Sequence, residues 1–489
     1  MDSLMRTEPE REASLLPECY VEKRSSKGFV ATPKATVDWM VDRLFRDKPP
    51  TARHKLLDPG CGTGAFIAGV LRWCRQRGLK PPRITGVEVD PRHMPILHEQ
   101  FRSARAVRIV EEDFLSSKVE QYDFIIGNPP YVAIGQLSET DRNRYRERFA
   151  AARGRFDLYL LFFEQAVKQL RPGGRMVFIT PEKFLYVESA RPVRRILADQ
   201  HVEELRLVRE DTFGDLVTYP TITVVTRGAP DRTRVIERDG KELAAHLPAD
   251  GSSWLPAITG SVGPKGGPVL ADICSRISCG IATGADEVFV RPTATLENGI
   301  RRFAHPTISG RELSPDATAL HSRFSMLIPY TNQGELLALE ELGPLGDYLK
   351  QPIMQALLRR RYCVSRKPWY AFHETPNLAE ILRPKILCKD IGERPQFWMD
   401  REGRIVPRHS IYYIVPRVPE FLKPTLEYLQ SMPAQKWLRQ NCQRAAKGFL
   451  RLQSRNLQRL PIPHSLASSL VSPAPRSDRD GSVAALSAG

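Results

Sequence analysis

The sequence predicts an α/β protein: a mostly parallel sheet with helices on both faces, followed by a second region of mixed strands and helices. Three observations lead to this fold class. Short apolar segments alternate with helical patterns over residues 28–230, as in sheets whose strands are buried on both faces. Glycine- and proline-rich turns separate these segments. The composition then shifts to glycine, proline, serine and charge over residues 227–270, which predicts a domain boundary near residue 250.

The elements of the first region are expected in a regular order. Residues 36–44 carry apolar side chains at helical spacing, and Thr32-Pro33 before them is a typical helix start. Apolar runs predict strands at residues 55–58, 83–89, 107–110, 122–126, 175–179 and 222–225, and helices are expected at residues 65–76 and 158–170. A turn at Arg171-Pro172-Gly173-Gly174 should end the second helix. Sheets of this kind bind ligands at the carboxyl ends of their strands.

The remaining parts of the chain have weaker patterns. Residues 1–27 are expected to form a flexible leader, and the low-complexity residues 465–489 a disordered tail. These limits predict one domain at residues 28–250 and another at residues 251–464. In the second domain the clearest extended segment is Ile405–Pro416.

Charge is distributed unevenly over the 489 residues, whose net charge is +16. Residues 1–250 hold 41 basic and 36 acidic side chains, residues 251–489 hold 31 and 20, and residues 351–460 alone hold 21 and 8. A basic second half indicates a polyanionic partner, most simply nucleic acid. A basic surface that serves solubility is the alternative.

Several classes of protein are excluded by the pattern of apolar residues and cysteines. No apolar run approaches the ~20 residues that span a bilayer, and the polar N-terminal segment has no signal-peptide core. The eight cysteines are scattered without a C-x-x-C pair or neighbouring histidines, so we expect neither a metal site nor a disulfide framework. We therefore expect a cytoplasmic protein with reduced thiols and no contact with a membrane.

A glycine-rich turn, Gly60-Cys61-Gly62-Thr63-Gly64, follows the first expected strand, which ends in Asp58. Glycines there allow positive φ angles and close approach of a ligand to the backbone. The turn continues with Ala65-Phe66 rather than Lys-Ser/Thr, which argues against a triphosphate-binding loop. A carboxylate directly before the turn suits an amine-bearing ligand better than a pyrophosphate. A tight structural turn is the alternative.

Two further carboxylates end the next two expected strands. Glu88 is positioned to bind a ribose diol, and Asp113 could accept a hydrogen bond from the amino group of an adenine. A ligand that carries an amine, a ribose and an adenine but no phosphates is S-adenosylmethionine. The three strand ends together therefore predict this cofactor.

The tetrapeptide Asn128-Pro129-Pro130-Tyr131 directly follows the fourth expected strand. Here the sequence resembles the S-adenosylmethionine-dependent amino-methyltransferases. Their target nitrogen is a poor nucleophile because its lone pair is delocalised, and carbonyls of Asn128 and Pro129 could accept its two N–H groups. The prolines stiffen the loop, and Tyr131 offers a face for stacking and for developing positive charge. A proline turn capped by asparagine is the alternative.

The order of these motifs resembles the gamma class of N6-adenine DNA methyltransferases, the Taq-like group of bacterial restriction-modification systems. Residues 28–33 precede the glycine-rich turn, and a long basic region follows the tetrapeptide. The resemblance covers residues 28–230 with specific motifs and residues 251–464 more loosely, where it implies a Taq-type specificity domain. It therefore implies a Rossmann-like class I S-adenosylmethionine methyltransferase domain followed by a mixed α+β target-recognition domain.

The resemblance also implies roles for individual residues. Those expected to bind the cofactor are Thr32, Asp58, Gly60, Gly62, Gly64, Glu88, Val89, Asp113 and Phe114. Those expected to take the target adenine are Asn128, Pro129, Pro130, Tyr131 and Phe213. Phe213 would be a second aromatic against a flipped-out base, or alternatively a core residue. An adenine N6 inside a duplex cannot reach the methyl donor, so base flipping is expected.

Basic residues interleaved with aromatic ones in the second half suggest contacts with double-stranded DNA. The candidates are Arg360, Arg361, Lys367, Trp369, Arg451 and Arg455. A solvated charged face is the alternative for each cluster.

Three functions remain open from the sequence. The first is a site-specific adenine-N6 DNA methyltransferase, working as a monomer, with a possible separate cognate restriction endonuclease. The second is an amino-methyltransferase that acts on RNA or on a protein glutamine. The third, from a different class, is a DNA-binding specificity protein with a vestigial methyltransferase fold.

Overall fold

The computed structural model describes residues 31–208, 219–260, 266–314, 320–444 and 449–468. Contacts divide the chain into two compact units, Met1–Gly260 and Ser261–Gly489. The division falls after the boundary expected near residue 250, because the short helix α7 (Leu255–Ile258) packs on the first unit. Trp254 and Ile258 are fully buried in the core of that unit.

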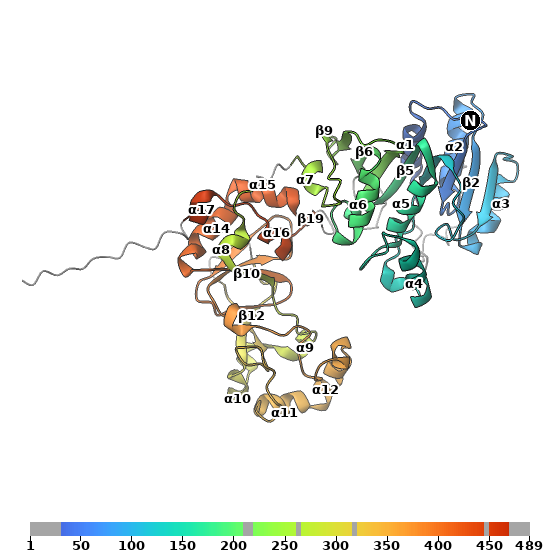
Figure 1. Ribbon diagram of the computed structural model, residues 1–489. Helices are drawn as coiled ribbons and strands as arrows, with labels where there is room; N and C mark the ends of the chain where they lie inside the picture. The colour runs from blue at the N-terminus through green and yellow to red at the C-terminus, as the bar shows by residue number, and fades with distance from the viewer. Residues whose placement is uncertain (1–30, 209–218, 261–265, 315–319, 445–448, 469–489) are drawn as a thin grey trace, which may run out of the picture. The chain divides into compact units, whose positions relative to one another are not determined.

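A nine-stranded sheet forms the centre of the first unit, with the strand order β3-β2-β1-β4-β5-β7-β6-β8-β9 (Figure 1). Its strands are β1 (Lys55–Pro59), β2 (Arg83–Glu88), β3 (Val107–Glu111), β4 (Tyr122–Gly127), β5 (Leu170–Pro181), β6 (His201–Leu207), β7 (Pro220–Thr226), β8 (Thr233–Ile236) and β9 (Glu242–Ala245). Strands β1 to β5 pair in parallel, and β7 runs antiparallel to both β5 and β6. The strand order reverses between β1 and β4, and sheets of this type bind ligands outside the carboxyl ends of their strands at such a point.

Helices cover both faces of this sheet, as predicted. Alternate residues of the central strands point to opposite cores: Leu56 packs with one helix layer and Leu57 with the other. The first layer contains α1 (Lys34–Phe45), α2 (Ala65–Gln76) and α3 (Met94–Phe101). The second layer contains α5 (Leu158–Gln169), α6 (Arg191–Ala198) and α7. Helix α4 (Glu139–Arg148) contributes one buried side chain, Tyr145, to the same core.

The expected turn at residues 171–174 is instead part of β5. Leu170 already pairs with Tyr122 of β4, and Gly173 and Gly174 exchange backbone hydrogen bonds with Arg227. Pairing with distant strands extends β5 here, and no local pattern reveals it. The later strands β6, β8 and β9 and helix α6 were also not predicted.

The described residues of the second unit form three smaller sheets. One has the order β10-β18-β14-β16, with β10 (Cys274–Cys279), β14 (Lys385–Lys389), β16 (Phe397–Asp400) and β18 (Ile411–Pro416). Another has the order β11-β13-β12-β17, with β11 (Val290–Pro292), β12 (Ala304–Ile308), β13 (Phe324–Leu327) and β17 (Val406–Pro407). The third joins β15 (Ile391–Gly392), β20 (Leu450–Arg451) and β19 (Gln443–Arg444). The predicted extended segment 405–416 is thus two strands in different sheets, β17 and β18.

Helices cover these sheets and enclose two separate cores. They are α8 (Leu270–Ile273), α9 (Asp286–Phe289), α10 (Asn298–Arg301), α11 (Pro344–Lys350), α12 (Pro352–Arg359), α13 (Leu378–Ile381), α14 (Leu422–Gln430), α15 (Met432–Asn441), α16 (Ser454–Gln458) and α17 (His464–Ser468). Helix α17 occupies the first residues of the segment expected to be disordered. The rest of that segment and the expected leader 1–27 lie outside the described residues.

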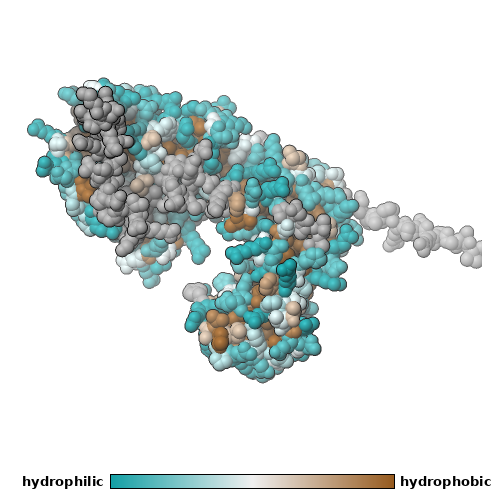
Figure 2. Space-filling view, turned by 180° about the vertical axis from the view of Figure 1, so that it is seen from behind, coloured by the Kyte–Doolittle hydropathy of each residue, from teal (hydrophilic) through white to brown (hydrophobic). Residues whose placement is uncertain are grey.

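Most of the surface seen in Figure 2 is hydrophilic, with small scattered hydrophobic patches. None of the helices in the described ranges is long and apolar enough to cross a membrane. Within the same ranges, no three histidine, cysteine or acidic side chains are grouped so that they could hold a metal ion.

Candidate active site

The glycine-rich turn after β1 has the positive φ angles that the sequence predicts. Gly60, Gly62 and Gly64 have φ angles of 76°, 55° and 84°. The backbone N–H groups of Gly60 and Cys61 donate to the carbonyl of Val87 at 2.8 and 2.9 Å. A Cβ atom at Gly64 would lie 2.5 Å from the ring of Phe101, so backbone conformation and space both require glycine there.

Asp58 is a buried carboxylate at the end of β1. It is fully buried, and neither oxygen has a hydrogen-bond partner among the residues that the structure describes. Burial, and then the nearby charge of Glu88, raise the pKa of Asp58 well above its usual range. Such a group costs free energy unless a cation or donor reaches it. The ammonium group of the methionine part of S-adenosylmethionine is a ligand that fits this requirement.

Glu88, at the end of β2, is held by backbone donors. Its Oε2 accepts from the N–H of Gly62 at 2.7 Å, and its Oε1 accepts from those of Val89 and Asp90 at 3.0 and 2.8 Å. Nδ1 of His93 lies 3.7 Å from Oε1. Burial alone would raise the pKa of Glu88, but the contacts with His93 and these N–H groups outweigh it and lower that pKa. Glu88 is therefore ionised and fixed, as a carboxylate that binds a ribose diol must be.

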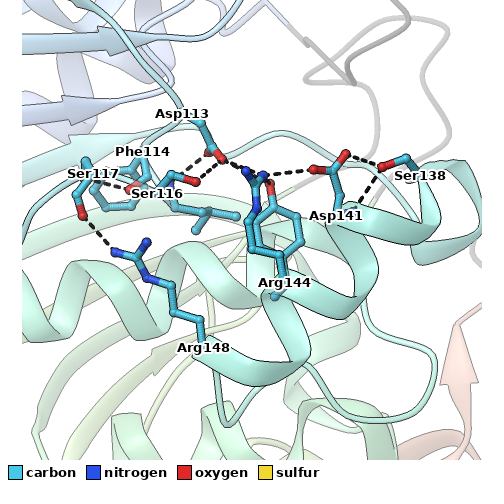
Figure 3. A network of polar contacts seen from close by, with 10 residues as sticks. Asp113, Phe114, Ser116, Ser117, Ser138, Asp141, Arg144 and Arg148 are labelled. Atoms are coloured by element: carbon cyan, nitrogen blue, oxygen red, sulfur yellow. Dashed lines mark hydrogen bonds and ion pairs between the residues drawn. The ribbon is translucent and has the colours of Figure 1, made fainter.

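Asp113 caps the turn after β3 and is partly exposed (Figure 3). Its Oδ1 accepts from the backbone N–H of Leu115 at 3.0 Å, and its Oδ2 accepts from the hydroxyl of Ser116 at 2.8 Å. The neighbouring Phe114 is buried, with its ring 5.1 Å from that of Phe162. The carboxylate thus lies at the surface of the turn, while the aromatic ring below it belongs to the core.

The tetrapeptide begins directly after β4, at the carboxyl end of that strand and beside β1. Nδ2 of Asn128 donates to the hydroxyl of Thr32 at 3.1 Å, which connects it to the segment before α1. Pro129 is buried. The hydroxyl of Tyr131 donates to the carbonyl of Ile179 at 3.5 Å, and burial raises its pKa above the usual range.

The tetrapeptide and the glycine-rich turn are close neighbours. A Cβ atom at Gly127, the residue before Asn128, would lie 3.3 Å from Oδ1 of Asp58, and one at Gly60 would lie 3.8 Å from Pro130. Adjacent pairing of β1 and β4 causes this proximity. The structure therefore brings together Asp58, the glycine-rich turn, Glu88 and the tetrapeptide.

Two further residues were predicted to contact a ligand, Val89 the cofactor and Phe213 the target base. Val89, next to Glu88, is 47% exposed, which is unusual for a valine at the end of a buried strand and makes it available to a ligand. Phe213 lies outside the described residues.

Three residues of this region were not predicted from the sequence. His93 lies beside Glu88, Tyr159 packs edge-on against Tyr131 with ring centroids 6.3 Å apart, and Arg144 contacts Asp113. His93 and Tyr159 are buried, and Arg144 comes from a helix 31 residues away. The sequence offered one weak signal for these residues, a histidine five positions after Glu88.

The DNA-binding candidates of the second unit have varied surroundings. Arg361 donates to the backbone carbonyls of Thr283, Leu358 and Trp369, and Lys367 donates to that of His373. These contacts stabilise the local chain. Arg451 forms an ion pair with Asp390 at 3.1 Å, and Trp369 packs at the edge of a core. Arg360 and Arg455 are exposed.

A groove whose lining includes four arginines lies in the first unit, between the chain after α4 and the start of α6. Its volume is about 780 Å³, and its lining includes Arg153, Arg155, Arg191 and Arg195 but only one acidic residue, Glu188. Arg153 and Arg155 are exposed. This groove is not evident from the sequence, because its arginines come from two separate segments that only the folded structure brings together.

Comparisons with known proteins agree with this architecture. Residues 92–213 match the Eco57I restriction-modification methylase family, and residues 305–462 match the TaqI-like C-terminal specificity domain. The type II methyltransferase M.PaeR7I of Pseudomonas aeruginosa is 24% identical over 90% of this chain and 86% of its own. M.XhoI of Xanthomonas vasicola is also 24% identical, over 90% of this chain and 91% of its own.

A solved structure shares the fold over most of the chain. The type IIL restriction-modification enzyme MmeI, solved in complex with DNA, matches with a TM-score of 0.58 and 14% identity. The match covers 92% of this chain and 65% of the MmeI chain. The expected class I methyltransferase fold and TaqI-like second domain are confirmed. The chain therefore carries an Eco57I-type methylase region and a TaqI-like specificity domain, and it is similar over most of its length to type II methyltransferases.

Proposed function

We propose that this protein transfers a methyl group from S-adenosylmethionine to the N6 amine of an adenine flipped out of duplex DNA. The observation that carries the proposal is the contact between two features at one sheet edge. The buried carboxylate of Asp58, which suits an ammonium group, directly adjoins the residue before Asn128-Pro129-Pro130-Tyr131. An amine-bearing donor and an amine acceptor could thus meet at the carboxyl ends of β1 and β4.

The cofactor would be held by residues from three strand ends. Asp58 and the turn from Gly60 to Gly64 would bind the methionine part, Glu88 the ribose, and Asp113 the adenine. S-Adenosylmethionine supplies a methyl group already activated on a sulfonium. The protein therefore needs no metal ion for this step, and its contribution is placement of the two reactants.

The target amine would be bound by the tetrapeptide. Carbonyl oxygens of Asn128 and Pro129 would accept its two N–H groups, which favours a pyramidal nitrogen with a more available lone pair. Stiff prolines keep these acceptors in place. Tyr131 would stack on the flipped base, and such stacking contributes ~1–3 kcal/mol per base. Tyr159, packed edge-on at 6.3 Å, supports the ring of Tyr131.

Binding of DNA would involve both units. The second unit holds the TaqI-like domain, predicted from the sequence at residues 251–464. It would recognise the target sequence through part of its basic surface. The groove lined by Arg153, Arg155, Arg191 and Arg195 would bind the phosphate backbone. In the cell the protein would be the modification component of a restriction-modification system, with a separate cognate endonuclease.

The proposal can be tested with S-adenosylmethionine labelled on its methyl group. The purified protein is offered unmethylated genomic DNA, total RNA and cell protein separately, and each product is hydrolysed and identified. Label in N6-methyladenine from DNA is expected. Label in N4-methylcytosine would overturn the assigned base, and label in RNA or in glutamine would overturn the substrate class. No transfer at all, despite cofactor binding, would favour a specificity protein with a vestigial fold.

A further inference from the structure

Helix α4 contacts the turn after β3 through polar side chains rather than an apolar face (Figure 3). Only Tyr145 of this helix is buried. Ser138 caps the helix by accepting from the N–H of Asp141 at 3.1 Å, and Oδ1 of Asp141 accepts from Arg144 at 2.9 Å. Arg144 continues this chain of contacts to Asp113. The helix is thus joined to Asp113 by a connected polar network.

The two oxygens of Asp113 are used unequally in this network. Oδ2 accepts from Ser116 at 2.8 Å and from both Arg144 and Tyr145 at 3.2 Å. Oδ1 accepts from the N–H of Leu115 at 3.0 Å, its one contact with the described part of the chain. A carboxylate has about four lone-pair sites, two on each oxygen. Oδ2 is therefore saturated, whereas Oδ1 can accept one more donor.

We propose that Arg144 and Tyr145 are positioning residues, which fix Asp113 so that its Oδ1 is presented to the amino group of the cofactor's adenine. This inference rests on the proposed function. Three donors on Oδ2 prevent rotation of the carboxylate and keep the two oxygens from exchanging roles. A partly exposed aspartate without them would sample several rotamers and would lose side-chain entropy on binding.

The surroundings of Tyr145 and Arg144 suit this role. The guanidinium of Arg144 lies 5.0 Å from the ring centroid of Tyr145 and donates to its hydroxyl at 3.3 Å, so the phenolic proton is directed toward Asp113. Burial raises the pKa of Tyr145 to about 12, which keeps this donor protonated. The same Nη2 atom of Arg144 that reaches Asp113 and Tyr145 also contacts Asp141, at 2.9 Å, which restrains the guanidinium further.

A purely structural role for these contacts is the competing explanation, and the same helix offers a matched control. Arg148, one turn beyond Arg144, donates to the backbone carbonyl of Ser117 at 2.8 Å. It therefore fastens α4 to the same turn without touching Asp113. Loss of Arg148 tests docking of the helix alone, whereas loss of Arg144 tests docking together with orientation of the carboxylate.

The experiment measures calorimetric affinities of the full chain for S-adenosylhomocysteine and for S-inosylhomocysteine, in which a carbonyl replaces the adenine amino group. The variants are Arg144→Gln, Tyr145→Phe and Arg148→Gln, and Arg144→Gln is repeated in an Asp113→Ala background. We expect Arg144→Gln and Tyr145→Phe to lower the affinity for S-adenosylhomocysteine roughly five- to thirtyfold, as for loss of a charged hydrogen bond. The affinity for S-inosylhomocysteine should change less than about twofold. In the Asp113→Ala background, Arg144→Gln should have no further effect.

Several results would overturn the inference. One is an equal loss of affinity for both ligands. Another is a selective loss of affinity for S-adenosylhomocysteine in Arg148→Gln as well. A third is an undiminished effect of Arg144→Gln in the Asp113→Ala background. In each of these cases the unsubstituted protein still binds S-adenosylhomocysteine, so the proposed function stands. If the unsubstituted protein binds neither ligand, the proposed function itself fails.

Discussion

The backbone N–H of Gly62 donates a hydrogen bond to Oε2 of Glu88 at 2.7 Å, and this contact ties the glycine-rich turn to the end of the neighbouring strand. Glu88 thereby organises the turn, and we propose that the same carboxylate binds the ribose of the cofactor. An amide in its place would direct an N–H group at backbone donors. Sites of this kind depend on such supporting contacts as much as on the group that touches the ligand.

Replacing Glu88 with glutamine should therefore weaken S-adenosylhomocysteine binding by about tenfold or more, because a charged acceptor is lost and the turn loosens. Isothermal titration calorimetry measures this. The control is Glu111→Gln, at the exposed end of β3, which should leave the affinity unchanged. Equal affinities of Glu88→Gln and the unsubstituted protein would exclude Glu88 from the cofactor site.

Asp58→Asn should stabilise the protein without ligand while it impairs cofactor binding. Burial, and then the charge of Glu88, raise the pKa of Asp58 well above its ordinary value of 3.8. The folded state thus holds this proton more tightly than the unfolded state. The stability from Asp58 is therefore full below pH 3.8 and is lost as the pH rises from there toward the folded-state pKa.

Urea unfolding at about pH 4 and about pH 8 tests this linkage. The advantage of Asp58→Asn in free energy of unfolding should be larger at the higher pH. Cofactor affinity of the unsubstituted protein should rise with pH as Asp58 ionises, and the variant should lack this rise. An advantage that is the same at both pH values would contradict the assigned titration.

Asn128→Ala should lower kcat by about 10²-fold or more, the size found when one positioned hydrogen-bonding group is removed from an active site. Tyr131→Ala should do the same through lost stacking. Tyr131→Phe is the matched control and should retain most activity, because the hydroxyl makes only a 3.5 Å contact with Ile179. S-Adenosylhomocysteine affinity should stay within about twofold in all three. Parallel loss of cofactor affinity and turnover would refute the roles assigned to the tetrapeptide.

Arg153→Gln combined with Arg155→Gln should weaken DNA binding and reduce its salt dependence. Each phosphate contact contributes about 0.9 to the slope of log K against log[salt], so the slope should fall by roughly one to two. Fluorescence anisotropy over a series of salt concentrations gives this slope. Arg102→Gln, which replaces a highly exposed arginine directly after α3, serves as control and should leave the slope unchanged. A lower affinity at constant slope would mean that the groove acts by another route.

Lys385→Met should destabilise the second unit by about 3–5 kcal/mol, the usual effect of breaking a buried ion pair. Lys385 is fully buried, and its Nζ lies 2.6 Å from Oδ2 of Asp400. The variant leaves this carboxylate buried without its cation. Lys385→Met with Asp400→Leu should recover much of the loss, as chemical unfolding can measure. A double variant as unstable as the single one would show that Asp400 is needed chiefly for its contact with the N–H of Ile405.

The sequence by itself determined the elements that local patterns encode. Helix α2 lies at Ala65–Gln76 as predicted. The strands that hold Asp58 and Glu88, and the strand before the tetrapeptide, lie within two residues of their expected limits. Apolar runs and glycine-rich turns specify these features because burial on both faces and positive φ angles act on neighbouring residues. The three strand ends could therefore be predicted as one site.

Tertiary structure alone decided which distant groups come into contact. The extension of β5 to Leu170, the contacts of Arg144 and Tyr145 with Asp113 and the arginine-lined groove all join segments far apart in sequence. The burial of Asp58, and hence its raised pKa, depends on helices and strands packed from both sides. Pairing between strands and the low dielectric of a core are properties of the folded chain, so no local pattern carries them.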